Sequence, residues 1–200
     1  MFVDSTARLA AAGVAYAPEI ATAAQHHGVD PCLLAAVAAQ ETGGPGTNAG
    51  RNVVGDGGHG RGLFQIDDRW HAFARTGAAM EPATNADYAA GMLRGLLDRY
   101  GNVHEALSAY NAGSPGATGT ETDWGGGARL GYADSVLRHY EQIAGGGPPP
   151  ESVASQPPAS AMQAGPFQAF QPPQLPTIQQ QSYHRQATDY SGLFDDDADA

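Results

Sequence analysis

Apolar residues recur at helical spacing near the start of the chain. Residues 17 to 28, APEIATAAQHHG, predict a helix that begins at Pro18 and ends at Gly28, because proline suits a first helical turn and glycine a helix end. Asp30 is placed to cap a second helix, which should end soon after Glu41, where the sequence GGPG follows. The apolar stripe of this second helix consists of Leu34, Val37 and Ala38.

Three further helices are predicted between residues 85 and 146. Asn85 is placed to cap the segment ADYAAGMLRGLLDRY, which ends at Gly101. VHEALSAYNAG, residues 103 to 113, and GYADSVLRHYEQIAGG, residues 131 to 146, also end in glycine. The inward-facing residues are predicted to be Tyr88, Met92, Leu96 and Leu97 in the first of these helices, and Val136, Leu137 and Tyr140 in the last.

The segment from Asn48 to Asp67 breaks the helical pattern. It is rich in glycine, and its short apolar runs VV at 53 and 54 and LFQI at 63 to 66 are strand candidates for a small hairpin. The chain is therefore predicted to have a mostly helical α+β fold with a small irregular β-hairpin insertion.

Composition divides the chain near Gly145. Nine of the 14 prolines lie in residues 146 to 200, a segment that also contains nine glutamines and ends in DDDADA. Such a composition is typical of disordered chain, although FQAFQPPQLP and YSGLF could be short docking peptides. We therefore predict a folded domain over residues 1 to 145 and a disordered Pro/Gln-rich tail with an acidic end over residues 146 to 200.

Charge and cysteine content limit the possible partners. The net charge is -11, so nucleic acid and anionic lipid are disfavoured as main partners. The single Cys32 excludes an internal disulfide. Asp4 stands where a secretory signal would carry positive charge, and no run approaches about 18 apolar residues, so neither a cleavable signal peptide nor a membrane span is expected.

Three carboxylates are candidates for chemistry: Glu41 at a helix end, and Asp56 and Asp67 at the two ends of GDGGHGRGLFQID. Cleavage of a glycosidic bond needs an acid that protonates the leaving oxygen, and inverting enzymes use a second carboxylate to activate water. Burial against apolar side chains raises the pKa of a carboxyl group, which would suit Glu41 to the first role. Asp56 and Asp67, nearer to water, would stay ionised.

The sequence motifs around these acids resemble those of goose-type lysozymes and the related soluble lytic transglycosylases of bacterial or phage type. The resemblance covers about residues 15 to 143. It consists, in order, of a helix ending in Glu followed by Thr, the turn GRGLFQI, and the tetrapeptide YNAG at 110 to 113. It implies a lysozyme-like fold and cleavage of the β-1,4 bond between N-acetylmuramic acid and N-acetylglucosamine in peptidoglycan.

The resemblance also implies roles for individual residues. Glu41 would be the general acid, and Asp56 and Asp67 would hold and activate the hydrolytic water. Among the implied substrate-binding residues, Gln65 and Gly62 would line the sugar cleft. Tyr110 would contact Glu41 or the muramyl sugar, and Asn111 would help to form the floor of the cleft. In the related transglycosylase route, the same Glu would act first as acid and then as base, and the muramyl 6-hydroxyl would give a 1,6-anhydro product.

Structural explanations stand beside these roles. Asp56 could simply form an Asp-Gly turn, and Asp67 could cap a helix beginning DRWHAF. Gln65 could satisfy buried backbone groups, and Tyr110 could be a core residue. Gly60 and Gly62 are more readily explained by backbone conformation than by ligand contact.

No cofactor or metal is expected. Apart from the adjacent pair 26 and 27, the histidines show no ligand spacing on one helix face, and a second cysteine is lacking. GHGRG lacks the lysine of a phosphate loop, which disfavours nucleotide binding. The histidines are His26, His27, His59, His71, His104, His139 and His184.

The sequence thus predicts a muramidase that acts at the bacterial cell wall. Hydrolysis is preferred because both aspartates are present, with lytic transglycosylation as the alternative. The rival from another class is a non-catalytic wall-binding component of a virion or secretion system. Without a signal peptide, the enzyme would reach the wall in a virion, through a holin or by a specialised secretion system, and the tail could bind it to such a particle.

Overall fold

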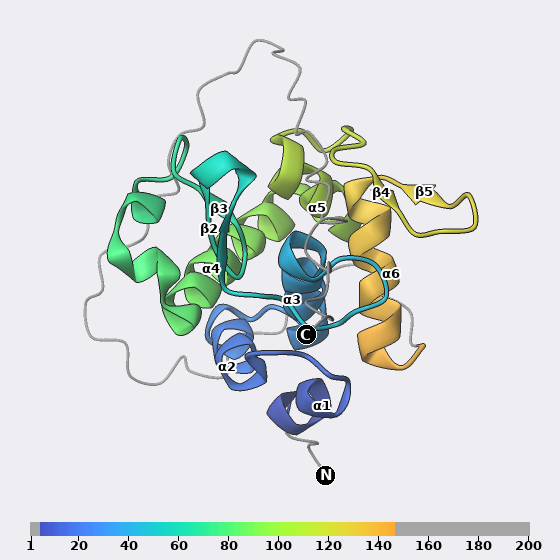
Figure 1. Ribbon diagram of the computed structural model, residues 1–200, viewed down its shortest axis with the longest axis horizontal. Helices are drawn as coiled ribbons and strands as arrows, with labels where there is room; N and C mark the ends of the chain where they lie inside the picture. The colour runs from blue at the N-terminus through green and yellow to red at the C-terminus, as the bar shows by residue number, and fades with distance from the viewer. Residues whose placement is uncertain (1–4, 147–200) are drawn as a thin grey trace, which may run out of the picture.

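The computed structural model describes residues 5 to 146. Six α-helices make up about half of this part, and two small antiparallel sheets lie apart from each other, on either side of α3 (Figure 1). The helices are α1 (Ser5–Ala11), α2 (Ala17–His27), α3 (Pro31–Ala38), α4 (Pro82–Tyr100), α5 (Val103–Ala112) and α6 (Tyr132–Ala144). The predicted mostly helical α+β class is confirmed. The predicted tail, residues 146 to 200, lies outside the described residues from 147 onward.

The predicted end of the first helix at Gly28 and the predicted cap of the second helix at Asp30 are correct, and both have local causes. Gly28 ends α2 in the left-handed conformation that glycine adopts without a steric penalty. Asp30 then caps α3, because its side-chain oxygen accepts hydrogen bonds from the backbone N–H groups of Cys32 and Leu33 at 2.8 and 3.1 Å. The seven residues from Cys32 to Ala38 are all buried, so α3 forms the centre of the core.

Glu41 does not lie at a simple helix end. α3 continues into a π-helical turn, η1 (Ala39–Gly43), which ends at Gly44 with φ 84°. A π-turn accommodates one more residue than an α-turn and is frequently found at functional sites. In Figure 1 this end of α3 lies between the two small sheets.

The glycine-rich segment forms three strands where a two-stranded hairpin was predicted. β1 (Val53–Gly55) pairs with β2 (Gly60–Gly62), and β2 pairs with β3 (Ile66–Asp67). The second strand is therefore GRG, and most of the predicted strand LFQI is the turn that joins β2 to β3. The turn has a tertiary cause: Leu63 and Phe64 enter the core, and Gln65 takes a positive φ of 47°.

The prediction that Asn85 caps a helix is wrong. α4 already begins at Pro82, and Asn85 is fully buried in its first turns. Its side chain accepts a hydrogen bond from Phe64 N–H at 2.9 Å and donates to the carbonyls of Arg61 and Ala79 at 3.1 and 2.9 Å. Asn85 therefore joins α4 to the sheet and to a preceding 3₁₀ turn.

Shorter elements complete the described part. 3₁₀ turns are η2 (Asp56–Gly58), η3 (Ala72–Arg75) and η4 (Gly77–Met80), and a second hairpin consists of β4 (Thr122–Asp123) and β5 (Arg129–Leu130). The predicted helix after Asp67 is thus only the short η3, which begins at residue 72. None of the helices in residues 5 to 146 combines the length and apolar character that crossing a bilayer requires.

Candidate active site

Glu41 is held by a tyrosine of the last helix. The Tyr132 hydroxyl, at the start of α6, donates a hydrogen bond to Glu41 Oε1 at 2.7 Å. Tyr132 is itself buried, and its ring is nearly parallel to that of Tyr110, with 6.4 Å between the ring centroids. The carboxylate of Glu41 thus contacts Tyr132, whose ring stacks with that of Tyr110 on α5, and Tyr132 is a site residue that sequence reasoning missed.

The residue before Glu41 joins the π-turn to the β4–β5 hairpin. Gln40 donates to Thr122 Oγ1 at 2.8 Å and accepts from the Ser135 hydroxyl at 2.5 Å. Ser135 in turn accepts a hydrogen bond from the indole N–H of Trp124 at 2.8 Å. This chain of polar groups connects three segments that are distant in sequence, so no local pattern could have indicated it.

The residue after Glu41 joins the π-turn to the other sheet. Thr42 is buried, and its hydroxyl lies 3.1 Å from the carbonyl oxygens of Ala38 and Leu63. The same hydroxyl accepts the backbone N–H of Arg51 at 2.8 Å, and the Arg51 side chain donates to the Thr42 carbonyl at 3.0 Å. Glu41 therefore lies on a turn that is fixed on both sides, by Gln40 and by Thr42.

The two predicted aspartates are brought together by an arginine. Arg69 donates to Asp56 Oδ2 at 2.5 Å and to Asp67 Oδ2 at 2.6 Å. Its Nε also lies 3.0 Å from both oxygens of Asp67. The hydrogen bonds from Arg69 to Asp67 are the main cause that raises the pKa of the guanidinium further above its usual range. Arg69 was not predicted from the sequence.

Asp68 fastens the same segment from the other side. It accepts from Arg61 at 2.9 Å and lies 2.8 Å from His59 Nδ1. The hydrogen bond with His59 is the first cause that lowers the pKa of Asp68 below its usual value. The adjacent acids Asp67 and Asp68 therefore have different partners, and together they hold the end of β3 in the three-stranded sheet.

Gln65 and Gly62 have structural explanations in the turn after β2. Gln65 is buried and donates to the carbonyls of Val53 and Gly62 at 3.0 and 2.8 Å. Its amide oxygen occupies the space where a Cβ on Gly55 or Gly60 would lie. Gly62 has φ 74°, and a Cβ there would come within 2.5 Å of the Ala79 carbonyl. Contact of Gln65 or Gly62 with substrate stays a prediction.

Asn111 organises the loop after α5. Its amide oxygen accepts the backbone N–H of Thr120 at 2.9 Å, and Gly119, with φ 67°, leaves the room that this oxygen needs. The Asn111 amide nitrogen is buried without a hydrogen-bond partner in residues 5 to 146. The predicted role of Asn111 in the floor of the cleft is therefore untested, but its role in shaping the loop is visible.

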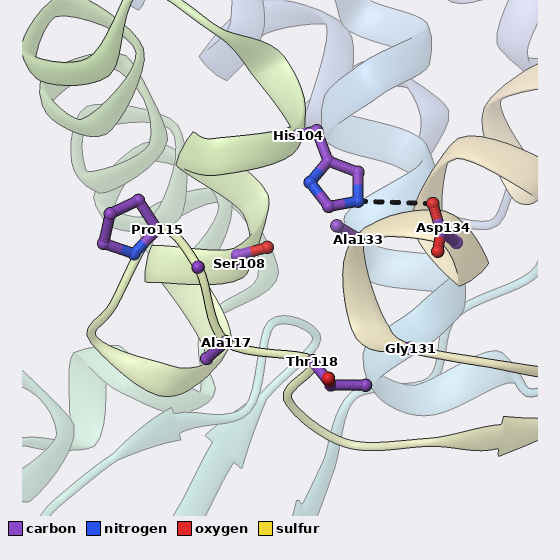
Figure 2. A pocket seen from close by; sticks show the side chains of 9 residues that line it. His104, Ser108, Pro115, Ala117, Thr118, Gly131, Ala133 and Asp134 are labelled. Carbon is purple, nitrogen blue, oxygen red and sulfur yellow. Dashed lines mark ion pairs between the residues drawn. The ribbon is translucent and has the colours of Figure 1, made fainter. Parts of the chain in front are cut away.

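A separate small pocket of about 170 Å³ lies between α5, α6 and the loop from 115 to 118 (Figure 2). It contains Ser108, His104 and Asp134, with the last two 3.2 Å apart. The combination does not form a nucleophile relay, because the buried Ser108 hydroxyl has no hydrogen-bond partner within the described residues. None of the predicted site residues lines this pocket.

Comparison with known proteins agrees with the resemblance. The family model of the transglycosylase SLT domain matches residues 18–122, which include Glu41, the three-stranded sheet and α5. Protein IpgF of Shigella flexneri is 30% identical over 128 residues, covering 61% of this chain and 78% of IpgF. The transglycosylase of Enterobacteria phage PRD1 is 30% identical over 131 residues, covering 65% of this chain and 44% of the phage protein.

No solved structure shows a significant match to this chain. The matched region of the family nevertheless includes the π-turn with Glu41, the three-stranded sheet and α5, and it ends before Tyr132 and Ser135 of α6. The chain belongs to the transglycosylase SLT domain family and is an enzyme that acts on peptidoglycan.

Proposed function

We propose that this enzyme is a lytic transglycosylase in which Glu41 is the single acid and base. Glu41 would protonate the oxygen of the β-1,4 bond as the bond to C1 of the muramyl sugar breaks. The resulting carboxylate would take the proton of the muramyl 6-hydroxyl, whose oxygen bonds to C1 and gives a 1,6-anhydro end. The Tyr132 hydroxyl, 2.7 Å from Oε1, would hold the carboxylate in place during both proton transfers.

The observation that carries this proposal is the ion pair of Arg69 with Asp56 and Asp67. Asp56 Oδ2 and both carboxylate oxygens of Asp67 already accept hydrogen bonds from Arg69. The two aspartates are therefore engaged by a fixed cation and are poorly placed to take a proton from water. Glu41 would then have to act as both acid and base.

Hydrolysis of the goose type, with Glu41 as general acid, is the second candidate. It is favoured by one observation: Arg69 brings Asp56 and Asp67 to the same place although β2 and the turn after it separate them in the sequence. Two carboxylates held in this way could position a water molecule by hydrogen bonds. In that case the product would carry a reducing end.

Mass spectrometry of the muropeptides released from purified sacculi distinguishes the two candidates. Anhydromuramic ends would support transglycosylation, and reducing muramic ends would support hydrolysis and overturn the first proposal. The double variant Asp56→Asn and Asp67→Asn should still release anhydromuropeptides if Glu41 acts alone. Loss of release in this folded double variant would show that the aspartates take part.

The assignment of Glu41 has its own test. Glu41→Gln keeps the size of the side chain but removes the proton donor, and we expect a loss of at least about 100-fold in the rate of release. Glu105→Gln on α5 is the matched control, because Glu105 is an exposed acid in the first turn of a helix. Equal clearing of a murein gel by wild type and Glu41→Gln would refute the role of Glu41.

Contact of Tyr110, Asn111, Gln65 and Gly62 with the glycan stays part of this proposal, as does binding of a virion or secretion-system protein by residues 146 to 200. The support for this part of the proposal is that one relative is a transglycosylase of a phage. Deletion of residues 146 to 200 should leave cleavage of purified sacculi intact but abolish partner binding. If partner binding and localisation both survived the deletion, the tethering role would be wrong.

A further inference from the structure

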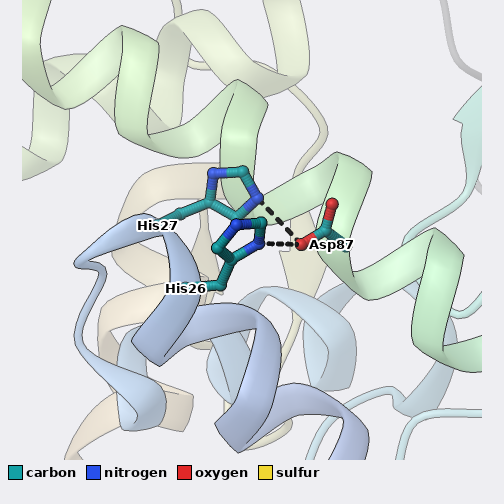
Figure 3. Close-up of side chains that lie close together, drawn as sticks. All are labelled: His26, His27 and Asp87. Atoms are coloured by element: carbon teal, nitrogen blue, oxygen red, sulfur yellow. Dashed lines mark hydrogen bonds and ion pairs between the residues drawn. The ribbon is translucent and has the colours of Figure 1, made fainter. Parts of the chain in front are cut away.

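Two adjacent histidines and an aspartate from another helix meet on the face of the molecule formed by α2 and α4. His26 Nδ1 and His27 Nε2, at the end of α2, lie 2.7 and 2.9 Å from the same oxygen of Asp87 on α4. Figure 3 shows both rings turned toward this oxygen. One potential ligand atom from each of the three residues lies within 4.8 Å of the other two.

The neighbouring residues provide the space that this arrangement needs. Gly91 lies one turn after Asp87 on α4, and a Cβ at this position would be 3.2 Å from Cε1 of the His27 ring. Glycine inside a helix costs about 1 kcal/mol relative to alanine. The close approach of the His27 ring to α4 gives Gly91 a structural reason, and the ring is only 26% exposed.

The electrostatic surroundings favour a cation. His26 and His27 are the last two residues of α2, where the helix dipole places partial negative charge. Arg94 also reaches this end of α2, where it lies 3.3 Å from the Gly28 carbonyl, but it is paired with Asp98. The positive charge of Arg94 is therefore already paired with a carboxylate.

We propose that His26, His27 and Asp87 bind a divalent transition-metal ion, with Zn²⁺ as the best match. Imidazole nitrogens with one carboxylate oxygen suit Zn²⁺, whereas Ca²⁺ and Mg²⁺ prefer oxygen ligands alone. The side chains of His26 and Asp87 are 69% and 47% exposed, so water can complete a four-coordinate shell. The ion would link the end of α2 to α4 and stabilise the fold.

This site could not be predicted from the histidine spacing. Adjacent residues on a helix point in directions about 100° apart, so a neighbouring pair does not by itself share a metal. The third ligand lies 60 residues further along the chain and comes into place only because α2 packs against α4. The proposal therefore departs from the sequence-based expectation that the protein binds no metal.

Calorimetric titration of the full chain, first stripped with a chelator, with Zn²⁺ tests the proposal. We expect saturable binding of one ion at this cluster and a rise in Tm on addition of Zn²⁺. His26→Gln and Asp87→Asn should each weaken this binding by at least about tenfold, since even a change next to a metal ligand commonly costs that much. The visible absorption spectrum of the protein loaded with Co²⁺ in place of Zn²⁺ should differ between wild type and the same variants.

A matched control is available in a second histidine–aspartate pair. His104 lies 3.2 Å from Asp134, but this pair lacks a second imidazole. His104→Gln should therefore leave the affinity for Zn²⁺ and the metal-induced rise in Tm unchanged. The His26→Gln variant should fold normally because His26 is largely exposed. Wild-type affinity in His26→Gln and Asp87→Asn, or no saturable binding in wild type, would overturn the proposal.

Discussion

Replacement of His139 should make the protein more resistant to acid. His139 is fully buried on α6, and neither ring nitrogen has a hydrogen-bond partner in residues 5 to 146. Burial, and secondarily the charge of Arg138, lowers the pKa of His139 from 6.5 to about 4. Trp124, which anchors Ser135 beside Gln40, packs against the same imidazole at 4.7 Å. Protonation of His139 would therefore disturb the packing next to the π-turn.

The sign and size of the effect follow from the two pKa values. Below pH 6.5 the unfolded chain binds a proton at His139 that the folded protein excludes. The contribution of His139 to the free energy of unfolding is therefore present at neutral pH and is lost as the pH falls toward 4. The full loss is about 3 kcal/mol, of which about 2 kcal/mol has already occurred at pH 5. Other groups titrate in the same range, so the contribution of His139 must be measured as a difference between proteins.

Urea unfolding followed by circular dichroism at pH 7 and pH 5 provides that difference. His139→Leu removes the titrating group, and its free energy of unfolding should fall by about 2 kcal/mol less than that of wild type between these pH values. His104→Gln, which replaces a half-exposed histidine, should behave as wild type. If His139→Leu lost as much stability as wild type on acidification, the buried imidazole would not be the cause.

Substitutions at three positions, in the π-turn, on α6 and in β2, give further predictions. Tyr132→Phe should reduce the rate of muropeptide release about tenfold with little change in folding, because Glu41 loses a hydrogen bond that orients it; an unchanged rate would contradict this. Thr42→Val should lower the free energy of urea unfolding by about 1 to 3 kcal/mol, whereas Thr42→Ser should keep most of it; equal losses in both would assign the effect to packing. Gly62→Ala should lower the free energy of unfolding by at least about 2 kcal/mol, and Tm with it, because the new Cβ would meet Asn85 and residue 62 has a positive φ. A Tm equal to that of wild type would contradict the close contact.

Local sequence signals were sufficient to predict helix ends where nearby residues provide the hydrogen bonds of the backbone groups. Gly28 and Asp30 end and begin helices through groups only two to four residues away, so their roles could be predicted from the sequence. Asn85 shows the limit of such signals. It is a good capping residue by type, but its partners lie 21 residues earlier at Phe64 and six residues earlier at Ala79.

The candidate site divides in the same way. The acids Glu41, Asp56 and Asp67 could be chosen from the sequence because carboxylates carry the chemistry of glycoside cleavage. The contact of Tyr132 with Glu41 and that of Arg69 with Asp56 could not, because each depends on how separate segments pack. Sequence spacing carries no information about such contacts unless the two residues share one helix or one turn.

The π-turn also constrains how this part of the sequence can change in length. Gln40, Glu41 and Thr42 point to three different partners, on β4, on α6 and in the turn after β2. Each residue of a helix adds about 100° of rotation, so a deletion in 39–43 that restored α-helical geometry would turn all the following side chains away from their partners. Substitutions at single positions would each remove one contact, whereas a change of one residue in length would remove several together. We expect related chains to vary in residue type here far more readily than in the number of residues between Asp30 and Gly44.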